Sequence, residues 1–328
     1  MRKIKQSVIF FSLMKPASPY YGICLNMRFC LILYLNYMAN KTLKQRLNNN
    51  EFSITAEIFP PKGTDVSGVY EKADILKDHV HAVNITDNQR AVVRYSSLAL
   101  CALLEKRGIE TVYQLTVRDR NRLALQSDLL ATKEFEIKNI VALSGDLPLL
   151  GDHKEAKPVY DFDTITLLDC IRKMNSGVDF NGHELKGATD LFIGAVCNPG
   201  YEPQELQVMT MQKKVLAGAQ FFQTQAIYSA DDYKIFSDNT KNLGAKILAG
   251  ILPLKSAKMA RFMNANVPGI SVPEKIIEIM EKSSDPISEG IRIAGDLING
   301  IKDFAHGVHI MAINFEEKIP DILKAAGL

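Results

Sequence analysis

One acidic residue stands out because it interrupts an apolar segment. Glu57 lies within residues 54–59, a segment that ends directly before Pro60 and Pro61. Burial disfavours the charged form of a carboxylic acid, and a carboxyl group that keeps its proton near neutral pH can act as a general acid. The other interpretation is an ion pair with a structural base such as Lys62. The position alone leaves both interpretations open.

Two further segments end in residues suited to binding a polar ligand. Gly145 and Asp146 follow residues 139–144. A glycine there permits close approach of the backbone to a ligand, and the aspartate is either a site residue or an ordinary turn former. Gln225 ends another segment and can pair with the donor and acceptor edge of a heterocycle, or it can be a core amide.

A third position is rich in arginine. Arg118, Arg120 and Arg122 follow residues 111–117 and precede a helix-like segment. Guanidinium groups beside a helix N-terminus are typical of a phosphate site, whereas the plain alternative is a solvated run of charges.

The histidines and cysteines suggest no further chemistry. Two of the six histidines, His306 and His309, lie at or beside the last β-rich segment, and none of the six is assigned to catalysis. Their spacing, and that of the five cysteines, predicts no metal site and no nucleophilic triad. The sparse cysteines are typical of a reducing compartment.

These residues must be held together by a fold, and the order of elements predicts one. β-rich segments alternate with helix-like ones such as 95–106, 122–132, 205–217 and 273–281, which is typical of a parallel sheet covered on both faces. The expected strands are 53–59, 81–86, 111–117, 139–144, 191–197, 220–226, 245–252 and 307–313. Eight strands close a (β/α)8 TIM barrel, whose active site lies where the strands end. Neither a dinucleotide fingerprint nor a phosphate loop is present to favour an open sheet.

Composition and charge limit the classes of function. The chain has 328 residues, of which 47% are hydrophobic and 23% charged, as in ordinary globular proteins. Residues 1–37 hold five basic residues and no acidic one, which leaves 34 basic and 37 acidic residues in the remainder. A balanced body without basic clusters argues against a nucleic-acid partner.

The first forty residues are expected to lie outside the fold. Asn26, Arg28 and Asn36 interrupt the second of two apolar runs there, which disfavours a membrane span. We expect residues 1–40 to be an irregular extension that arises from a start assigned too far upstream, with a membrane anchor as the alternative. Residues 41–328 are then one barrel domain, in a cytoplasmic protein.

Four collinear motifs resemble those of the methylenetetrahydrofolate reductase family. They are residues 57–62 (Glu-Ile-Phe-Pro-Pro-Lys), 144–148 (Ser-Gly-Asp-Leu-Pro), 213–219 (Lys-Lys-Val-Leu-Ala-Gly-Ala) with Gln225, and 250–253 (Gly-Ile-Leu-Pro). The resemblance covers residues 53–328. Residues 114–128 look most like the short flavoprotein members of clostridial and acetogenic type.

The resemblance implies a flavin-bearing barrel that interconverts 5,10-methylene- and 5-methyltetrahydrofolate. Glu57 matches the family's general acid, Asp146 the aspartate near flavin and pterin, and Gln225 the glutamine that binds the pterin edge. The implied cofactor is FAD, with FMN as the alternative. The positions that match flavin contacts are Thr86, Gln114, Arg118, Gly145, Asp146, Tyr160 and Lys214.

The sequence also departs from the family pattern. Gln114 stands where many members have histidine, residues 196–198 (Val-Cys-Asn) replace Tyr-Pro-Glu, and Ala257 replaces a phenylalanine. These changes leave the electron donor open between NAD(P)H and a reduced iron–sulfur partner protein, in a homo-oligomer or a hetero-complex. The alternatives are a flavin electron-transfer subunit that needs such a partner, and a pterin-binding methyltransferase barrel.

Overall fold

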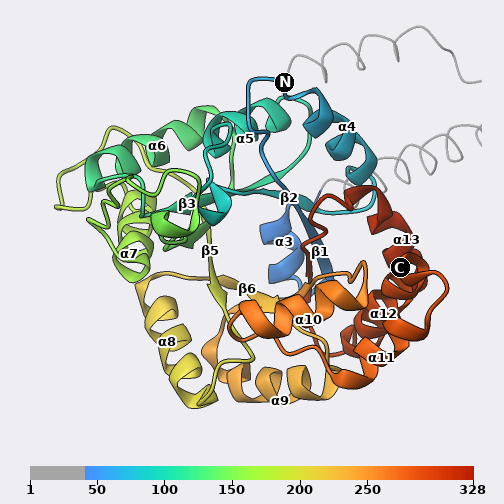
Figure 1. The fold of residues 1–328 in the computed structure, drawn as a ribbon. Coiled ribbons are helices and arrows are strands. Elements are labelled where there is room, and N and C mark those ends of the chain that lie inside the picture. Colours follow the sequence, from blue (N-terminus) through green and yellow to red (C-terminus); the bar gives the residue numbers. More distant parts are fainter. Residues whose placement is uncertain (1–40) are drawn as a thin grey trace, which may run out of the picture. The chain divides into compact units, whose positions relative to one another are not determined.

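The strands of the computed structural model, which describes residues 41–328, form a closed parallel barrel. Each strand pairs with the next one in the chain, and β8 pairs with β1 (Figure 1). The eight strands are β1 (Ser53–Ile58), β2 (Ala82–Ile85), β3 (Thr111–Thr116), β4 (Asn139–Leu143), β5 (Phe192–Cys197), β6 (Phe221–Ala226), β7 (Lys246–Ile251) and β8 (Gly307–Ile310). The predicted (β/α)8 barrel is therefore confirmed, with every strand inside or close to its expected range.

Helices lie around the barrel and across its amino end. They are α3 (Leu43–Asn48), α4 (Ser67–Leu76), α5 (Ser97–Glu105), α6 (Arg122–Glu134), α7 (Thr164–Asn175), α8 (Gln204–Ala217), α9 (Ala230–Thr240), α10 (Ala257–Asn266), α11 (Glu274–Lys282), α12 (Pro286–Ile301) and α13 (Ile319–Ala325). Short 3-10 turns lie at η2 (Gln89–Ala91), η3 (Pro148–Leu150), η4 (Lys241–Leu243) and η5 (Glu316–Lys318). The four expected helices correspond to α5, α6, α8 and α11. Side chains cap several N-termini, as Asn121 does for α6 and Asp163 for α7.

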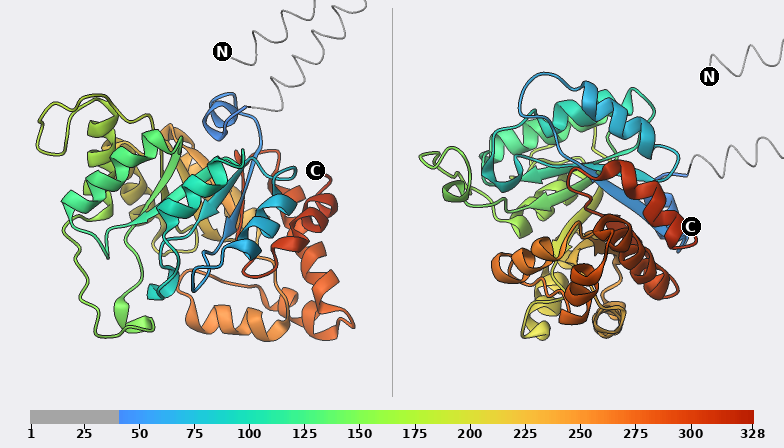
Figure 2. Two further views of the ribbon diagram at one scale, coloured as in Figure 1. Left: turned by 90° about the horizontal axis from the view of Figure 1, so that it is seen from above. Right: turned by 45° about the vertical axis from the view of Figure 1, so that its right-hand side comes forward.

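The amino end of the barrel is closed by an apolar floor. Leu43 and Leu47 of α3 are fully buried against inward-facing side chains of six strands, namely Ala82, Val112, Val141, Phe192, Phe221 and Leu248. The left view of Figure 2 shows α3 as the short blue helix at one end of the barrel. The rings of Phe192 and Phe221 stack at 4.8 Å between centroids. Gly194 makes room for this stack, because a Cβ there would lie 2.3 Å from the Phe221 ring.

Above the floor the barrel interior is polar. Thr55, Asn84, Gln223 and His309 come from four different strands and are all buried, and hydrogen bonds join them across the barrel. Side chains alternate along a strand, so Glu57, two residues beyond Thr55, faces the same interior one step nearer the carboxyl end. From the amino end to the carboxyl end, the barrel interior therefore holds the apolar floor, then the polar side chains, and then Glu57.

Residues Leu43–Leu328 form one compact unit. No helix within the part of the chain that the structure describes is long and apolar enough to cross a membrane. The expectations for residues 1–40, including the membrane-anchor alternative, lie outside the described residues.

Candidate active site

Glu57 occupies the centre of the candidate site and is 7% exposed. Its Oε2 accepts a hydrogen bond from Nε2 of Gln114 at 3.1 Å, and Nε2 of His309 lies 3.6 Å from the same oxygen. Lys62, the alternative partner considered from the sequence, instead forms an ion pair with Asp152. The carboxyl group is thus held by two interior side chains, and no described lysine or arginine forms an ion pair with it.

His309 is a site residue that the sequence reasoning missed. It lies on β8, and its Cα is paired in register with that of Thr55 on β1. Its Nδ1 lies 3.0 Å from Oγ1 of Thr55 and 3.4 Å from Nε2 of Gln223. The available signal was the two-residue period of the last strand, which places His309 on the inward face together with Gly307.

The amide of Gln223 connects this histidine to the opposite wall. Asn84 donates to Oε1 of Gln223 at 2.7 Å, and Gln223 donates back to Oδ1 of Asn84 at 3.1 Å. Both side chains are almost completely buried. Buried amides keep a fixed orientation when both ends are bonded, so this pair also fixes what Gln223 presents to His309.

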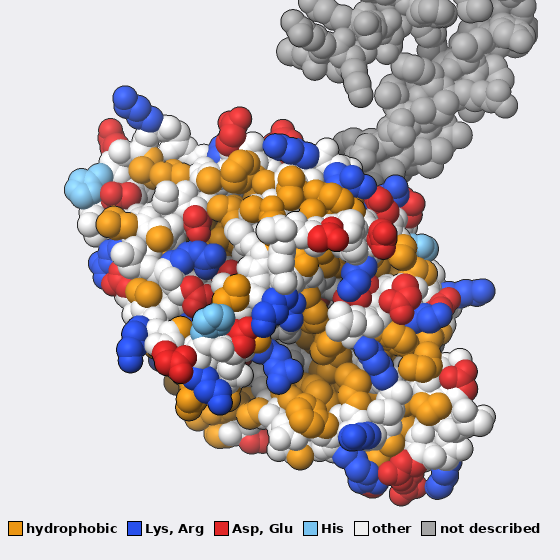
Figure 3. All heavy atoms as spheres, turned by 45° about the horizontal axis from the view of Figure 1, so that its top comes forward, with side chains coloured by type: hydrophobic (Ala, Val, Ile, Leu, Met, Phe, Trp, Pro, Cys, Tyr) orange, Lys and Arg blue, Asp and Glu red, His pale blue; other side chains and the backbone are white. Residues whose placement is uncertain are grey.

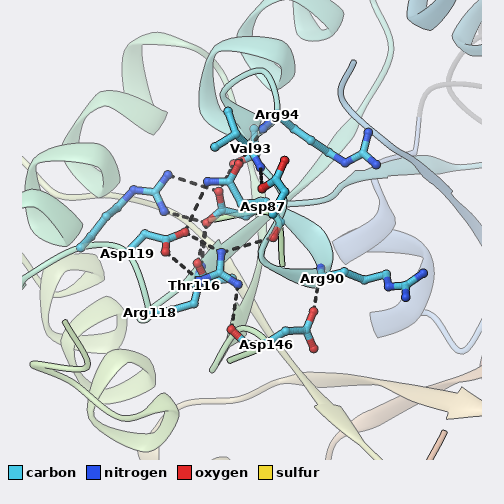
Figure 4. A network of polar contacts seen from close by, with 12 residues as sticks. Asp87, Arg90, Val93, Arg94, Thr116, Arg118, Asp119 and Asp146 are labelled. Atoms are coloured by element: carbon cyan, nitrogen blue, oxygen red, sulfur yellow. Dashed lines mark hydrogen bonds and ion pairs between the residues drawn. The ribbon is translucent and has the colours of Figure 1, made fainter. Parts of the chain in front are cut away.

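Arg118 is 2% exposed and takes part in the network of polar contacts drawn in Figure 4. Its guanidinium donates to both carboxylate oxygens of Asp119, at 2.7 and 2.6 Å, and to the backbone carbonyls of Asp146 at 3.0 Å and Asn88 at 3.2 Å. Arg118 therefore joins the loops that follow β2, β3 and β4. All of these hydrogen bonds of the Arg118 guanidinium are made to other groups of the protein.

The other two arginines of this loop are also paired. Arg120 forms ion pairs with Asp87 and Asp128, and Arg122 does so with Asp161. The hydrogen bonds from Arg122 hold the pKa of Asp161 down at about 2. Each guanidinium of the predicted phosphate-binding loop is thus matched by a carboxylate within the described residues.

Gly145 and Asp146 form the tight turn after β4. Gly145 has φ +83°, and a Cβ there would lie 3.0 Å from Cβ of Arg118. The Asp146 side chain is exposed, and its Oδ2 accepts a hydrogen bond from the backbone N–H of Arg90 at 2.7 Å. The turn therefore needs glycine, and it places Asp146 at the surface of the carboxyl end.

Two polar groups at the strand ends make no hydrogen bond to another described residue. Oγ1 of Thr86 is buried and has no hydrogen-bond partner. The Gln225 side chain is half-buried at a bulge in the β6–β7 pairing, and its Oε1 accepts from the N–H of Ala226 at 3.1 Å. Its amide nitrogen makes no hydrogen bond among the described residues. A buried polar group without a partner, as at Thr86, is expected where a ligand supplies the partner.

The remaining predicted residues are more peripheral. Lys214 on α8 donates to the carbonyl of Val196 at 2.7 Å, and burial lowers the pKa of its ammonium group. Tyr160 is 38% exposed with φ +42°, a left-handed backbone conformation that is uncommon outside glycine. No contact joins either residue directly to Glu57. On the face drawn in Figure 3 the surface is hollowed, with basic and hydrophobic side chains around the recess.

Metal chemistry finds no support in the described part of the chain. It contains no group of three or more histidine, cysteine, aspartate or glutamate side chains that could hold a metal ion. Cys101, Cys170 and Cys197 are buried free thiols, and burial raises the pKa of each one.

Comparison with known families decides which group this barrel belongs to. The family model described as methylenetetrahydrofolate reductase matches residues 42–327, nearly all of the described chain. The chain belongs to the methylenetetrahydrofolate reductase family. The predicted family and the assignment as an enzyme of that family are therefore confirmed.

Relatives of several lengths share this similarity. Methylenetetrahydrofolate reductase 2 of Schizosaccharomyces pombe is 27% identical over 86% of this chain, which spans 46% of that protein. The 5,10-methylenetetrahydrofolate reductase of Buchnera aphidicola is 23% identical over 90% of this chain and 99% of its own length. The Escherichia coli enzyme of the same name is 24% identical, with 81% and 88% covered. The chain thus spans about half of the yeast relative and most of the two bacterial ones.

A solved structure shares the fold. A Clostridium thermocellum protein, described as binding two copies of 5-methyl-5,6,7,8-tetrahydrofolic acid, superposes with a TM-score of 0.57. It is 17% identical, and the match covers 86% of this chain and 97% of that one.

Proposed function

We propose that this protein reduces 5,10-methylenetetrahydrofolate to 5-methyltetrahydrofolate with the help of a bound flavin, with Glu57 as the general acid. The observation that carries the proposal is the position of the Glu57 carboxyl group and its hydrogen bonding. It is buried at the carboxyl end of the barrel and held through Oε2 by Gln114, while its Oε1 makes no hydrogen bond within the described residues. An oriented acid with one free oxygen suits proton transfer to a bound substrate.

The substrate class is supported by the relatives and by the strand ends. The bacterial relatives are described as 5,10-methylenetetrahydrofolate reductases, and the Clostridium thermocellum neighbour as binding a methylated folate. In this chain the unbonded amide nitrogen of Gln225 is suited to the donor and acceptor edge of a pterin. We infer that the folate ring lies between Gln225 and Glu57.

The strand ends also fit a flavin. The buried Oγ1 of Thr86 lacks a partner, and Gln114 donates through Nε2 to Glu57, which leaves its carbonyl oxygen available. We infer that these two groups bind the flavin directly. The other residues inferred to hold it are Arg118, Gly145, Asp146, Tyr160 and Lys214, of which Arg118 acts by fixing the loops that end in Asn88 and Asp146.

Glu57 and Asp146 have different roles in the proposed reaction. Glu57 protonates a folate nitrogen through Oε1, which opens the five-membered ring to an iminium. When bound in its reduced form, a flavin would supply the hydride that the iminium carbon needs to become a methyl group. Asp146, whose backbone carbonyl and carboxylate are both anchored, keeps a negative charge near the cationic intermediate. Burial of Glu57 keeps bulk water from competing for its proton.

Several finer properties belong to the same proposal. The electron donor is NAD(P)H or a reduced iron–sulfur partner protein, the flavin is FAD or FMN, and the assembly is a homo-oligomer or a hetero-complex. A cytoplasmic location is part of this proposal. Gln114, which stands where the resemblance implies a histidine in many members, donates directly to Glu57, and we infer that this position affects the choice of electron donor.

A test uses the full chain purified without air. The visible spectrum reports flavin, and bleaching of the flavin band by 5-methyltetrahydrofolate reports the reverse half-reaction. Glu57→Gln should keep the flavin spectrum and its reduction by dithionite, yet lose at least a hundredfold in folate-dependent bleaching, since general acid–base catalysis contributes about 10²–10⁴-fold.

The matched control is Glu105→Gln, which neutralises another largely buried glutamate on the outer helix α5. Its folate-dependent bleaching should match that of the unchanged protein. Normal bleaching in Glu57→Gln would remove Glu57 from the acid role. A colourless protein that binds folate would instead favour the methyltransferase alternative.

A further inference from the structure

Lys255, in the loop between β7 and α10, is a half-buried cation held by uncharged groups. Its Nζ donates to the backbone carbonyls of Ile313 at 2.6 Å and of Asn314 at 3.3 Å. The same atom lies 5.3 Å from the centroid of the Phe315 ring. Carbonyl oxygens and the face of an aromatic ring attract an ammonium group, but they carry no net charge to neutralise it.

Other lysines at the loops around the strand ends have a counter-charge. Lys62 pairs with Asp152 and Lys72 pairs with Glu316, whereas Lys255 forms no ion pair with any described residue. Partial burial of an unpaired charge is unfavourable, and a ligand that brings the opposite charge offsets this cost. An ammonium group has three hydrogens, of which the two carbonyls occupy two. The third hydrogen of Lys255 is therefore available to an anionic group.

The carbonyls that hold Lys255 belong to a strained turn after β8. Ile313 has φ +46° and Asn314 has φ +56°, a left-handed conformation that is a clear outlier for a β-branched residue. Buried Glu316 holds the turn from its other side, since its Oε1 accepts from the N–H of Asn314 at 3.2 Å and its Oε2 pairs with Lys72 at 3.0 Å. Strain of this kind persists where the surrounding structure enforces it, and it is common at binding sites. The turn therefore fixes the position of the ammonium group.

The loops after β7 and β8 lie at the carboxyl end of the barrel, between two residues of the candidate site. In the strand order β6-β7-β8-β1, Gln225 belongs to β6 and Glu57 to β1. The residues inferred to hold the flavin belong instead to β2, β3 and the connections that follow β3, β4 and β5. A pterin ring between Gln225 and Glu57 therefore has Lys255 on the rim of its own half of the barrel. The helix α10 begins two residues after Lys255, and the partial positive charge of its N-terminus adds to the attraction of an anion.

We propose that Lys255 binds a glutamate carboxylate of the folate through the third hydrogen of its ammonium group. This inference rests on the proposed function and assigns one further substrate-binding residue. A folate consists of a pterin ring, an aminobenzoyl group and a glutamate with two carboxylates, so a pterin bound in the barrel leaves the carboxylates at the rim. Across the opening, Arg118, Arg120 and Arg122 are already paired with carboxylates of the protein.

Two ligands that differ in charge test the proposal directly. 5-Methyltetrahydrofolate has both carboxylates, and its dimethyl ester has the same rings and neither charge. Isothermal titration calorimetry of the full chain without air gives a dissociation constant for each. A hydrogen bond between charged groups changes affinity by about tenfold to a hundredfold, so the unmodified protein should bind the acid about tenfold or more tightly than the ester. Salt screens charges, so added NaCl should lower this preference.

The variant Lys255→Met keeps the length of the side chain and removes its charge and its hydrogens. The ratio of the two dissociation constants is the decisive quantity, because any loosening of the turn at Ile313 weakens both ligands alike. We expect the preference for the acid to disappear, with a ratio close to one. Lys255→Arg keeps a positive charge and should keep most of the preference. An unchanged ratio in Lys255→Met, with both ligands bound more weakly, would show that Lys255 only braces the turn and would overturn the proposal.

Arg90→Gln is the matched control. Arg90 lies in the loop after β2 at the same end of the barrel, is exposed, and uses its backbone N–H, not its guanidinium, to contact Asp146. The ratio should stay unchanged in this variant, and its loss there would overturn the assignment to Lys255. Equal affinity of the unmodified protein for acid and ester would overturn the inference and leave the proposed function intact. Binding of neither ligand would refute the proposed function, and this inference with it.

Discussion

The amide pair between Asn84 and Gln223 allows a quantitative test of the polar interior. Asn84 is fully buried and Gln223 is 2% exposed, and each donates to the carbonyl of the other. Gln223→Met removes both bonds and leaves the two ends of Asn84 without partners. A buried polar group left unsatisfied costs about 1–3 kcal/mol, so the loss in unfolding free energy should be about 3–4 kcal/mol. Asn84→Leu should cost a similar amount by stranding Gln223.

The double variant Asn84→Leu/Gln223→Met provides the decisive comparison. Replacing both members of a buried pair by apolar groups of similar shape is nearly neutral, and Thr55 keeps a contact with Nδ1 of His309 at 3.0 Å. We therefore expect the double variant to be more stable than either single variant, with a coupling energy of about 2–3 kcal/mol. Urea unfolding followed by circular dichroism measures all four proteins. Additive losses, with the double variant destabilised by about the sum of the two single changes, would refute the prediction that Asn84 and Gln223 are energetically coupled.

Two further predictions concern the floor and the outer wall. Gly194→Ala places a Cβ 2.3 Å from the buried Phe221 ring and should lower the unfolding free energy by about 3 kcal/mol, as measured in urea, with partial recovery in Gly194→Ala/Phe221→Leu. Burial raises the pKa of Glu105 to about 7 from its ordinary value of 4.5, so the folded state binds the proton more tightly than the unfolded state does. The free energy of unfolding therefore falls as the pH rises from 4.5 to about 7. Glu105→Gln should remove that fall, gaining about 2 kcal/mol at pH 8 relative to pH 4, which urea midpoints at the two pH values would check.

The barrel was predictable because its signals are local and repeated. Eight β-rich segments separated by helical ones leave few topologies once short right-handed connections are required. The floor was harder to predict, because α3 has only six residues. Its two leucines are buried by side chains from six strands, and these contacts form only when the barrel closes. Short plugs of this kind carry no periodicity to detect.

The buried position of Glu57 was predictable, whereas its contacts were not. Glu57 is conspicuous as a charge in an apolar strand, but its contact with His309 joins residues 252 positions apart. That contact depends on barrel closure, which brings β8 beside β1 in a register that pairs Thr55 with His309. Sequence reasoning could consider only nearby bases and named Lys62 as the alternative partner, but in the structure Lys62 pairs with Asp152.

The arginine loop shows a different limit. Three guanidiniums in five residues predicted an anion site, but their charges are balanced by aspartates that lie up to 39 residues away. Arg118 instead donates to the backbone carbonyls of two neighbouring loops. A charge count along the chain cannot show this compensation, since it arises only when the loops at the carboxyl ends of the strands come together.

Closure of the barrel also explains why one carboxyl group can be buried there at all. A protonated glutamic acid needs a single acceptor for its hydrogen and donors for its other oxygen, whereas its carboxylate needs donors at both oxygens. Gln114 donates to Oε2, and no described residue donates to Oε1. The interior therefore supplies only part of the hydrogen bonds that either protonation state needs. Under the proposed function, a substrate nitrogen would be the missing partner at Oε1. A fully satisfied carboxylate at this position would be more stable and would have no proton to give.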